Sequence, residues 1–149
     1  MFTSTADAPV LLDIHHEHER LEVLFAELKW ALLKPSVAHL AIIRELMDEL
    51  AALLADHFAH EEQGGYFDEL VDLNPAVSPR VERLQAQHRQ MLASVQNINR
   101  QLRHADNTPL WFAVLRTAFN DFVQTCEAHQ HEENSLMQEG YLRDDGEGD

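Results

Sequence analysis

The sequence predicts an all-α protein folded as an antiparallel, up-down-up-down four-helix bundle. Apolar residues recur every three or four positions through four long segments, which is the periodicity of an amphipathic helix. Short stretches rich in proline, glycine and asparagine separate these segments. No run of alternating apolar and polar residues lies between turn residues, so no strand is expected. Four such helices with short connections bury their apolar stripes most simply as a bundle.

The first two helices are expected at about residues 10–33 and 37–62. Pro9 precedes the first periodic stretch, and the segment 34–36 separates it from the second. The glycine pair at 64–65 follows the second stretch. These positions set the expected limits because proline and glycine are the strongest interruptions of a helical pattern.

The last two helices are expected at about 79–104 and 109–138. Ser78 and Thr108 each precede a proline, which is the pattern of an N-cap residue followed by proline at the first helical position. Gly140 is expected to end the fourth helix.

Large apolar side chains indicate where the core lies. The connection 63–78 carries several of them and is therefore expected to pack against the bundle. The aromatic residues expected in the core are Phe25, Trp30, Phe58, Trp111, Phe119 and Phe122.

Length and charge restrict the class of protein. One domain is expected over residues 1–149, with the bundle at about 10–138 and an acidic tail at 141–149. Acidic residues outnumber basic residues 26 to 11, for a net charge of −15. This excess argues against nucleic acids and anionic membranes as partners, since both are bound by basic faces. No apolar run is long enough to span a membrane and no basic leader segment is visible, so a cytoplasmic protein is expected.

Histidine is the commonest metal ligand, and the chain has ten. Each apolar stripe contains one, and the second and fourth stripes add a glutamate four residues later. Residues at i and i+4 lie above one another on a helix, so each His-x-x-x-Glu pair can direct two ligands to one place. One pattern occurs twice along the chain: a histidine is followed about forty residues later by His-x-x-x-Glu. The candidate metal ligands are therefore His18, His57, Glu61, His88, His129 and Glu133.

These six side chains suit a pair of metal ions. Two such hairpins packed antiparallel bring all six to the middle of one core, where buried charges need partners. Nitrogen and carboxylate oxygen without thiolate suit iron, manganese or zinc. Six ligands over two ions leave positions open for water, hydroxide or a small diatomic molecule, which favours dioxygen chemistry over a closed structural site.

Several neighbouring residues are alternatives as ligands. His15 is one turn from His18 and shares much of its face, while His16 gives an equal spacing of 72 residues between the two repeats. His18 is favoured because the flanks of His16 make a poor core stripe. His60 and Glu62 lie off the main stripes and are expected as surface groups or as partners of the ligands, although either can complete the ligand set.

A simpler explanation exists for each part of the pattern. One His-x-x-x-Glu pair alone is more simply an exposed pair worth roughly a few tenths of a kcal/mol. Both pairs lie on core stripes with two further histidines, so metal binding is favoured over a metal-free bundle. Cys126, one turn before His129, is most simply a small buried hydrophobe, although it is placed to line the same pocket.

With these residues the chain resembles the hemerythrin-like, or HHE cation-binding, family over about residues 10–138. The resemblance implies a bundle that holds a non-haem di-iron centre. It implies that His18, His57, His88 and His129 are terminal ligands and that Glu61 and Glu133 bridge the two irons. The segments that carry it are EHERL at 17–21, HFAHEE at 57–62, QHR at 87–89 and HQHEE at 129–133.

The chain departs from the oxygen-carrying hemerythrins in two places. Those carriers have a second histidine one turn from the third-helix histidine, where this chain has Leu84 and Leu92 on either side of His88. Asn134 stands where they use an aspartate, and Glu133 offers the carboxylate instead. The ligand set is thus poorer in histidine and richer in carboxylate. This favours sensing, peroxide chemistry or iron handling at least as much as reversible oxygen carriage.

The expected function is that of a non-haem di-iron protein that binds dioxygen or a related small ligand, in oxygen, iron or redox sensing, storage or handling. Zinc or manganese can substitute for iron in such a site. One alternative is a di-iron oxidase or peroxide-consuming enzyme, although His-x-x-x-Glu differs from the Glu-x-x-His spacing of ferritin-like bundles. The other is an iron-responsive regulatory module that acts through a protein partner.

Overall fold

The structure is a computed structural model that describes the backbone of residues 4–34 and 36–147 and the side chains of residues 13–34 and 36–139. Helices account for almost all of this part of the chain, and it contains no strand. The elements in order are α1 (Ser4–Leu33), α2 (Val37–Gln63), α3 (Tyr66–Leu73), the 3₁₀ helix η1 (Pro75–Val77), α4 (Ser78–Arg103) and α5 (Pro109–Glu147).

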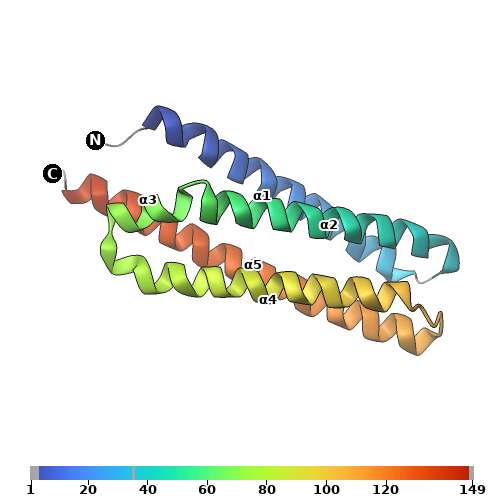
Figure 1. The fold of residues 1–149 in the computed structure, drawn as a ribbon. Coiled ribbons are helices and arrows are strands. Elements are labelled where there is room, and N and C mark those ends of the chain that lie inside the picture. Colours follow the sequence, from blue (N-terminus) through green and yellow to red (C-terminus); the bar gives the residue numbers. More distant parts are fainter. Residues whose placement is uncertain (1–3, 35, 148–149) are drawn as a thin grey trace.

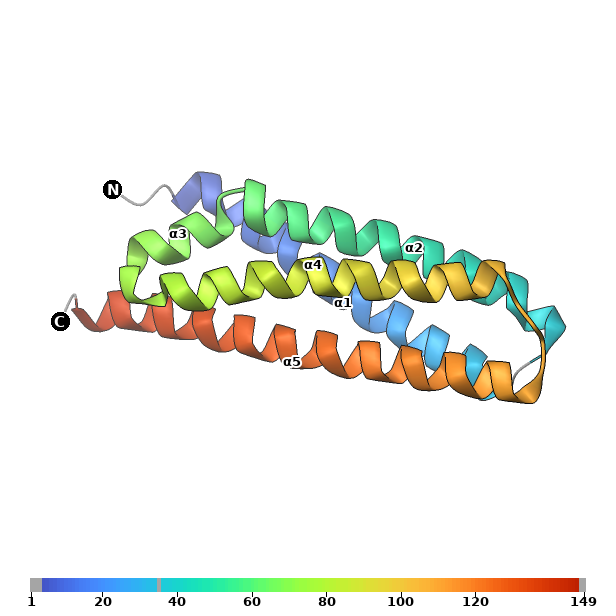
Figure 2. The same cartoon turned by 60° about the horizontal axis from the view of Figure 1, so that its bottom comes forward.

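The four long helices form the predicted up-down-up-down bundle (Figure 1). α1 packs against α2 and α5, and α4 packs against the same two helices from the other side. Each long helix is antiparallel to the one that precedes it, as the second view also shows (Figure 2). The short helix α3 lies at the end of the bundle where both chain termini lie. No helix in the described part is both long and apolar enough to cross a membrane.

Two clusters of buried apolar side chains fill the bundle. The larger cluster occupies the half toward the α1–α2 and α4–α5 connections. The smaller cluster lies under α3 and consists of Ile14, Tyr66, Phe67, Leu70, Val77, Val81, Leu84 and Leu136. On α1, α4 and α5 the predicted metal ligands fall between residues of the smaller cluster and residues of the larger one, and on α2 they lie at the end of the larger cluster, just before the smaller-cluster residues of α3. The polar residues are therefore surrounded by apolar packing on both sides.

The connection 63–78 packs against the bundle, as expected. It contains α3 and η1, and its Tyr66, Phe67 and Leu70 are buried. Gly65 precedes α3 with a φ of 92°, in the left-handed region that glycine adopts without a Cβ clash. The helix α3 itself was not expected from the sequence pattern, because eight residues are too few to show a clear period.

The N-cap predictions are half right. The Thr108 hydroxyl accepts a hydrogen bond from the backbone N–H of Trp111 at 3.1 Å, so Thr108 caps α5. Ser78 has helical dihedrals, and its side chain makes no capping bond. The reason is the preceding turn of 3₁₀ helix, which leads directly into α4 and begins with Asn74 accepting a bond from the N–H of Ala76.

Two predicted helix ends are wrong. α1 begins at Ser4 and continues through Pro9, where the missing N–H removes a single hydrogen bond near the start of the helix. α5 continues through Gly140 to Glu147, so most of the predicted tail is helical, and residues 148–149 lie outside the described part. Glycine inside a helix costs roughly 1 kcal/mol relative to alanine. That cost disfavours a helix without ending it.

Trp30 does not lie in the core, contrary to the prediction from the sequence. Its side chain is 69% exposed, because it lies about 200° around α1 from the buried Leu28. Phe25 and Trp111 are half-buried at the edge of the larger cluster, and the other aromatic residues expected in the core are buried.

Candidate metal centre

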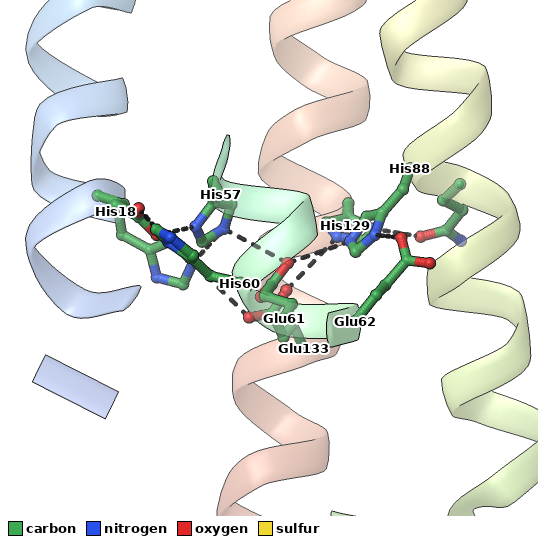
Figure 3. Close-up of polar contacts among 10 residues, drawn as sticks. His18, His57, His60, Glu61, Glu62, His88, His129 and Glu133 are labelled. Atoms are coloured by element: carbon green, nitrogen blue, oxygen red, sulfur yellow. Dashed lines mark hydrogen bonds and ion pairs between the residues drawn. The ribbon is translucent and has the colours of Figure 1, made fainter. Parts of the chain in front are cut away.

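All four long helices contribute to one polar cluster in the core (Figure 3). It contains every predicted metal ligand: His18 from α1, His57 and Glu61 from α2, His88 from α4, and His129 and Glu133 from α5. Five of these six are buried, and the side chain of His18 is 13% exposed. The two copies of the hairpin, α1–α2 and α4–α5, therefore place their histidines and glutamates opposite one another in the core.

The donor atoms form two groups that share both glutamates. In each group the four candidate ligand atoms lie within 4.8 Å of one another. One group is His18, His57, Glu61 and Glu133, and the other is Glu61, His88, His129 and Glu133. These are the only such groups among the described side chains.

Each glutamate lies between histidines of the two groups. Oε1 of Glu61 is 3.5 Å from Nε2 of His57 and 3.1 Å from Nε2 of His88. Glu133 lies in the same way between His18 and His129, at 3.6 Å and 3.5 Å from their Nε2 atoms. Both carboxylates are thus in position to contact two ions at once.

The outer ring nitrogens of His57, His88 and His129 have acceptors of their own. Nδ1 of His57 donates to Oε1 of Glu17 at 3.0 Å, and Nδ1 of His88 donates to Oε2 of Glu62 at 2.7 Å. A proton on Nδ1 leaves Nε2 as the lone-pair nitrogen of a neutral ring. Hydrogen bonding of the outer nitrogen to a carboxylate or amide is the usual way in which proteins orient metal-binding histidines.

The inner atoms of the cluster lack partners. Both carboxylate oxygens of Glu61 and of Glu133, and Nε2 of His88 and of His129, are buried without a hydrogen bond from any described group. Buried polar atoms without partners are costly and rare in folded proteins. A cation at the centre would satisfy them together, so the donor set fits a metal.

Burial controls the protonation of the cluster. It lowers the pKa of His18 and of His88 to about 4, so both imidazoles are neutral at neutral pH. Burial and the neighbouring Glu133 raise the pKa of Glu61 well above its usual value. Glu61 is therefore the carboxyl group of the cluster that tends to keep its proton, and neutral imidazoles are the form that binds metal.

Aromatic rings close one side of the cluster. The ring of His88 is stacked between Phe58, at a centroid distance of 3.9 Å, and Phe67, at 5.6 Å. The other side has a cavity of about 20 Å³ whose lining includes His18, His57 and Glu133. That volume is enough for about one water-sized molecule.

The alternative ligands lie outside the cluster. His15 is exposed and pairs with Glu19 at 2.8 Å, and His16 is exposed. His60 is half exposed, and its Nδ1 is 2.6 Å from Oε2 of Glu17. Glu62 contacts only the outer nitrogen of His88 among the candidate ligands.

Two residues that bond to histidines of the cluster are not predicted as their partners by the sequence pattern. Glu17 bonds His57, and Gln87 bonds Nδ1 of His129 at 2.6 Å. Both stand immediately before the first histidine of their hairpin, and this shared position was visible in the sequence. Their reach to the next helix was not visible, because it depends on the packing of two helices.

The bundle and its buried histidine and glutamate side chains define a candidate cation-binding protein. The sequence model of the hemerythrin HHE cation binding domain matches residues 11–139. The chain belongs to this family. No curated protein and no solved structure gives a significant match.

Proposed function

We propose that this chain is a non-haem di-iron protein that binds dioxygen or a related small ligand at a metal pair in the bundle core. Under this proposal His18 and His57 hold one iron ion, and His88 and His129 hold the other. Glu61 and Glu133 bridge the two ions.

The observation that carries the proposal is the sharing of both glutamates by two groups of donor atoms. Two ions fit the inner atoms better than one, because the histidines fall into two separate groups that share only the two glutamates. Two ions give every unpartnered inner oxygen and nitrogen a positive partner.

The donor chemistry admits iron and two competing metals. Imidazole nitrogen with carboxylate oxygen suits iron, manganese and zinc. The thiol of Cys126 lies outside both groups, and burial raises its pKa to about 12, so it stays protonated. Reduced iron would supply the electrons for dioxygen chemistry, which zinc cannot do.

The protein's own residues orient the site and limit its ligand. Glu17, Glu62 and Gln87 fix the rings of three histidines, and Phe58 and Phe67 keep water from the His88 side. The cavity of about 20 Å³ beside His18 and His57 favours a diatomic molecule over a larger substrate.

Metal analysis and spectroscopy of protein purified without oxygen test the proposal. We expect about two iron ions per chain, because each donor group suits one ion. We also expect a visible absorption change when oxygen is added. A reversible change indicates binding, bleaching indicates sensing or redox chemistry, and turnover of added peroxide indicates an enzyme. Protein without stoichiometric metal would refute the di-iron centre.

A further inference from the structure

The inner cavity has a larger hollow directly outside it. A groove of about 420 Å³ lies on the surface between α1 and α5. Three residues line both the groove and the inner cavity: Phe25, Cys126 and Gln130. These three side chains therefore form the wall that separates the groove from the space beside the metal ligands.

The composition of this wall allows it to open. Phe25 is only half-buried and contacts Phe122 edge-on, with ring centroids 6.3 Å apart. Cys126 and the half-buried Gln130 stand one turn apart on α5 and face Phe25 across the seam. An aromatic ring at a surface, a small side chain and an unbranched amide can all move without disturbing the backbone.

Much of the remaining cavity lining is apolar. Leu21, Leu54 and Met91 line it from inside the larger apolar cluster, and Phe58 separates it from His88. The groove, by contrast, is open to water and is crossed at its rim by the exposed pair Lys29 and Glu127 at 3.7 Å.

We propose that small neutral molecules enter the metal centre from the α1–α5 groove, between Phe25, Cys126 and Gln130, and that these three side chains select entrants by size. The inference rests on the proposed function for its biological meaning. The path itself is a property of the chain without metal. Because the Cys126 thiol is protonated, the passage presents no charge to a molecule such as dioxygen.

Two substitutions change the width of the passage in opposite directions. Cys126→Met extends a longer side chain into the passage, and Thr125→Met places the same side chain on the exposed neighbouring position as a control. Phe25→Ala removes the ring, and Trp30→Ala removes an exposed ring elsewhere on α1 as its control. Circular dichroism and thermal denaturation verify that each variant is folded.

Nitric oxide, a neutral diatomic molecule that binds ferrous iron, is the probe for the iron-loaded protein. We expect Cys126→Met to slow its association about tenfold or more and Phe25→Ala to accelerate it, with the dissociation rate changing by a similar factor. The equilibrium affinity for nitric oxide should then stay within about threefold of the wild-type value. Side chains that only line a passage change both rates and leave the affinity nearly constant, whereas loss of a metal ligand would change the affinity. Unchanged rates in both variants of protein that contains two irons would overturn the passage and leave the di-iron proposal standing.

A second measurement needs no metal. Cys126 is the only cysteine, so its modification by the small neutral reagent methyl methanethiosulfonate, through the small ionised fraction of the thiol, reports access to this wall. Phe25→Ala should accelerate the reaction in metal-free protein about tenfold, and Trp30→Ala should not accelerate it. The rate should not depend on low urea concentrations, because the reagent then reaches Cys126 without partial unfolding of the protein. Equal rates in the wild type and Phe25→Ala would refute the passage. Absence of metal would refute only the proposed function.

Discussion

Oε1 of Gln87 on α4 accepts a hydrogen bond from Nδ1 of His129 on α5 at 2.6 Å. Glu17 on α1 has the same relationship to His57 on α2, at 3.0 Å. In both hairpins the residue before the first histidine thus orients the second histidine. The two halves differ in chemistry, since one partner is a carboxylate and the other an amide.

Removing the Gln87 amide should weaken metal binding without unfolding the bundle. In Gln87→Leu the Nδ1 of His129 loses its acceptor and the ring loses its fixed orientation. We expect metal affinity to fall about 10–100-fold, the usual effect of losing such a partner. Competition with a chromophoric chelator measures this. Gln90→Leu, at an exposed position of the same helix, is the control, and equal affinities for the two variants would contradict the role of Gln87.

Removing a ligand should cost at least one metal ion per chain. In His57→Ala one donor group loses a nitrogen, and in Glu133→Ala both groups lose a carboxylate. The helices should remain, because apolar clusters on both sides of the site hold the bundle together. Metal analysis beside circular dichroism tests this, with the exposed His15→Ala as control. Retention of two ions in either variant would refute the ligand assignment.

The sequence predicts the bundle and the composition of the cluster well, because both depend on periodicity. His18 could be preferred to His16 since it continues the apolar stripe of α1, and the structure places it beside His57, with 3.0 Å between their Nε2 atoms. Helix ends depend on small energies, so Gly140 was wrongly expected to end α5. Contacts between helices, such as that of Gln87 with His129, depend on packing that no local pattern contains.

Metal binding should release a proton from Glu61 rather than from His18 or His88. Burial lowers the pKa of His18 and His88 to about 4, so protons compete with metal at these positions only as the pH falls toward 4. The raised pKa of Glu61 leaves a proton for the metal to displace, so affinity rises with pH as that proton is lost.

Calorimetric titration with zinc in two buffers of different ionisation enthalpy counts the released protons. At pH 7 we expect at most about one per chain for the wild type. Glu61→Gln should release none, because the amide has no proton to lose. Release of several protons, with affinity rising steeply between pH 6 and 7, would instead show that the histidines are charged before metal binds.

Replacing Glu61 by leucine should stabilise the metal-free protein and abolish its stabilisation by metal. Both Glu61 oxygens are buried without hydrogen bonds, and the pKa of this side chain is raised because burial disfavours its charge. A leucine of similar volume removes that cost, which is about 1–3 kcal/mol for an unsatisfied buried group. The same substitution removes a ligand shared by both donor groups.

Urea denaturation with a chelator and with added zinc separates the two effects of Glu61→Leu. Wild-type protein should gain stability from zinc, as any ligand that binds only the folded state provides. The variant should have a higher urea midpoint than wild type in chelator, and its stability should rise little when zinc is added. Asp56→Leu, at an exposed position of α2, controls for the added apolar side chain. If the variant is less stable than wild type in chelator, Glu61 supports the fold itself and the prediction is wrong. The geometry indicates instead that the protein keeps this side chain at a cost to its stability in order to bind metal.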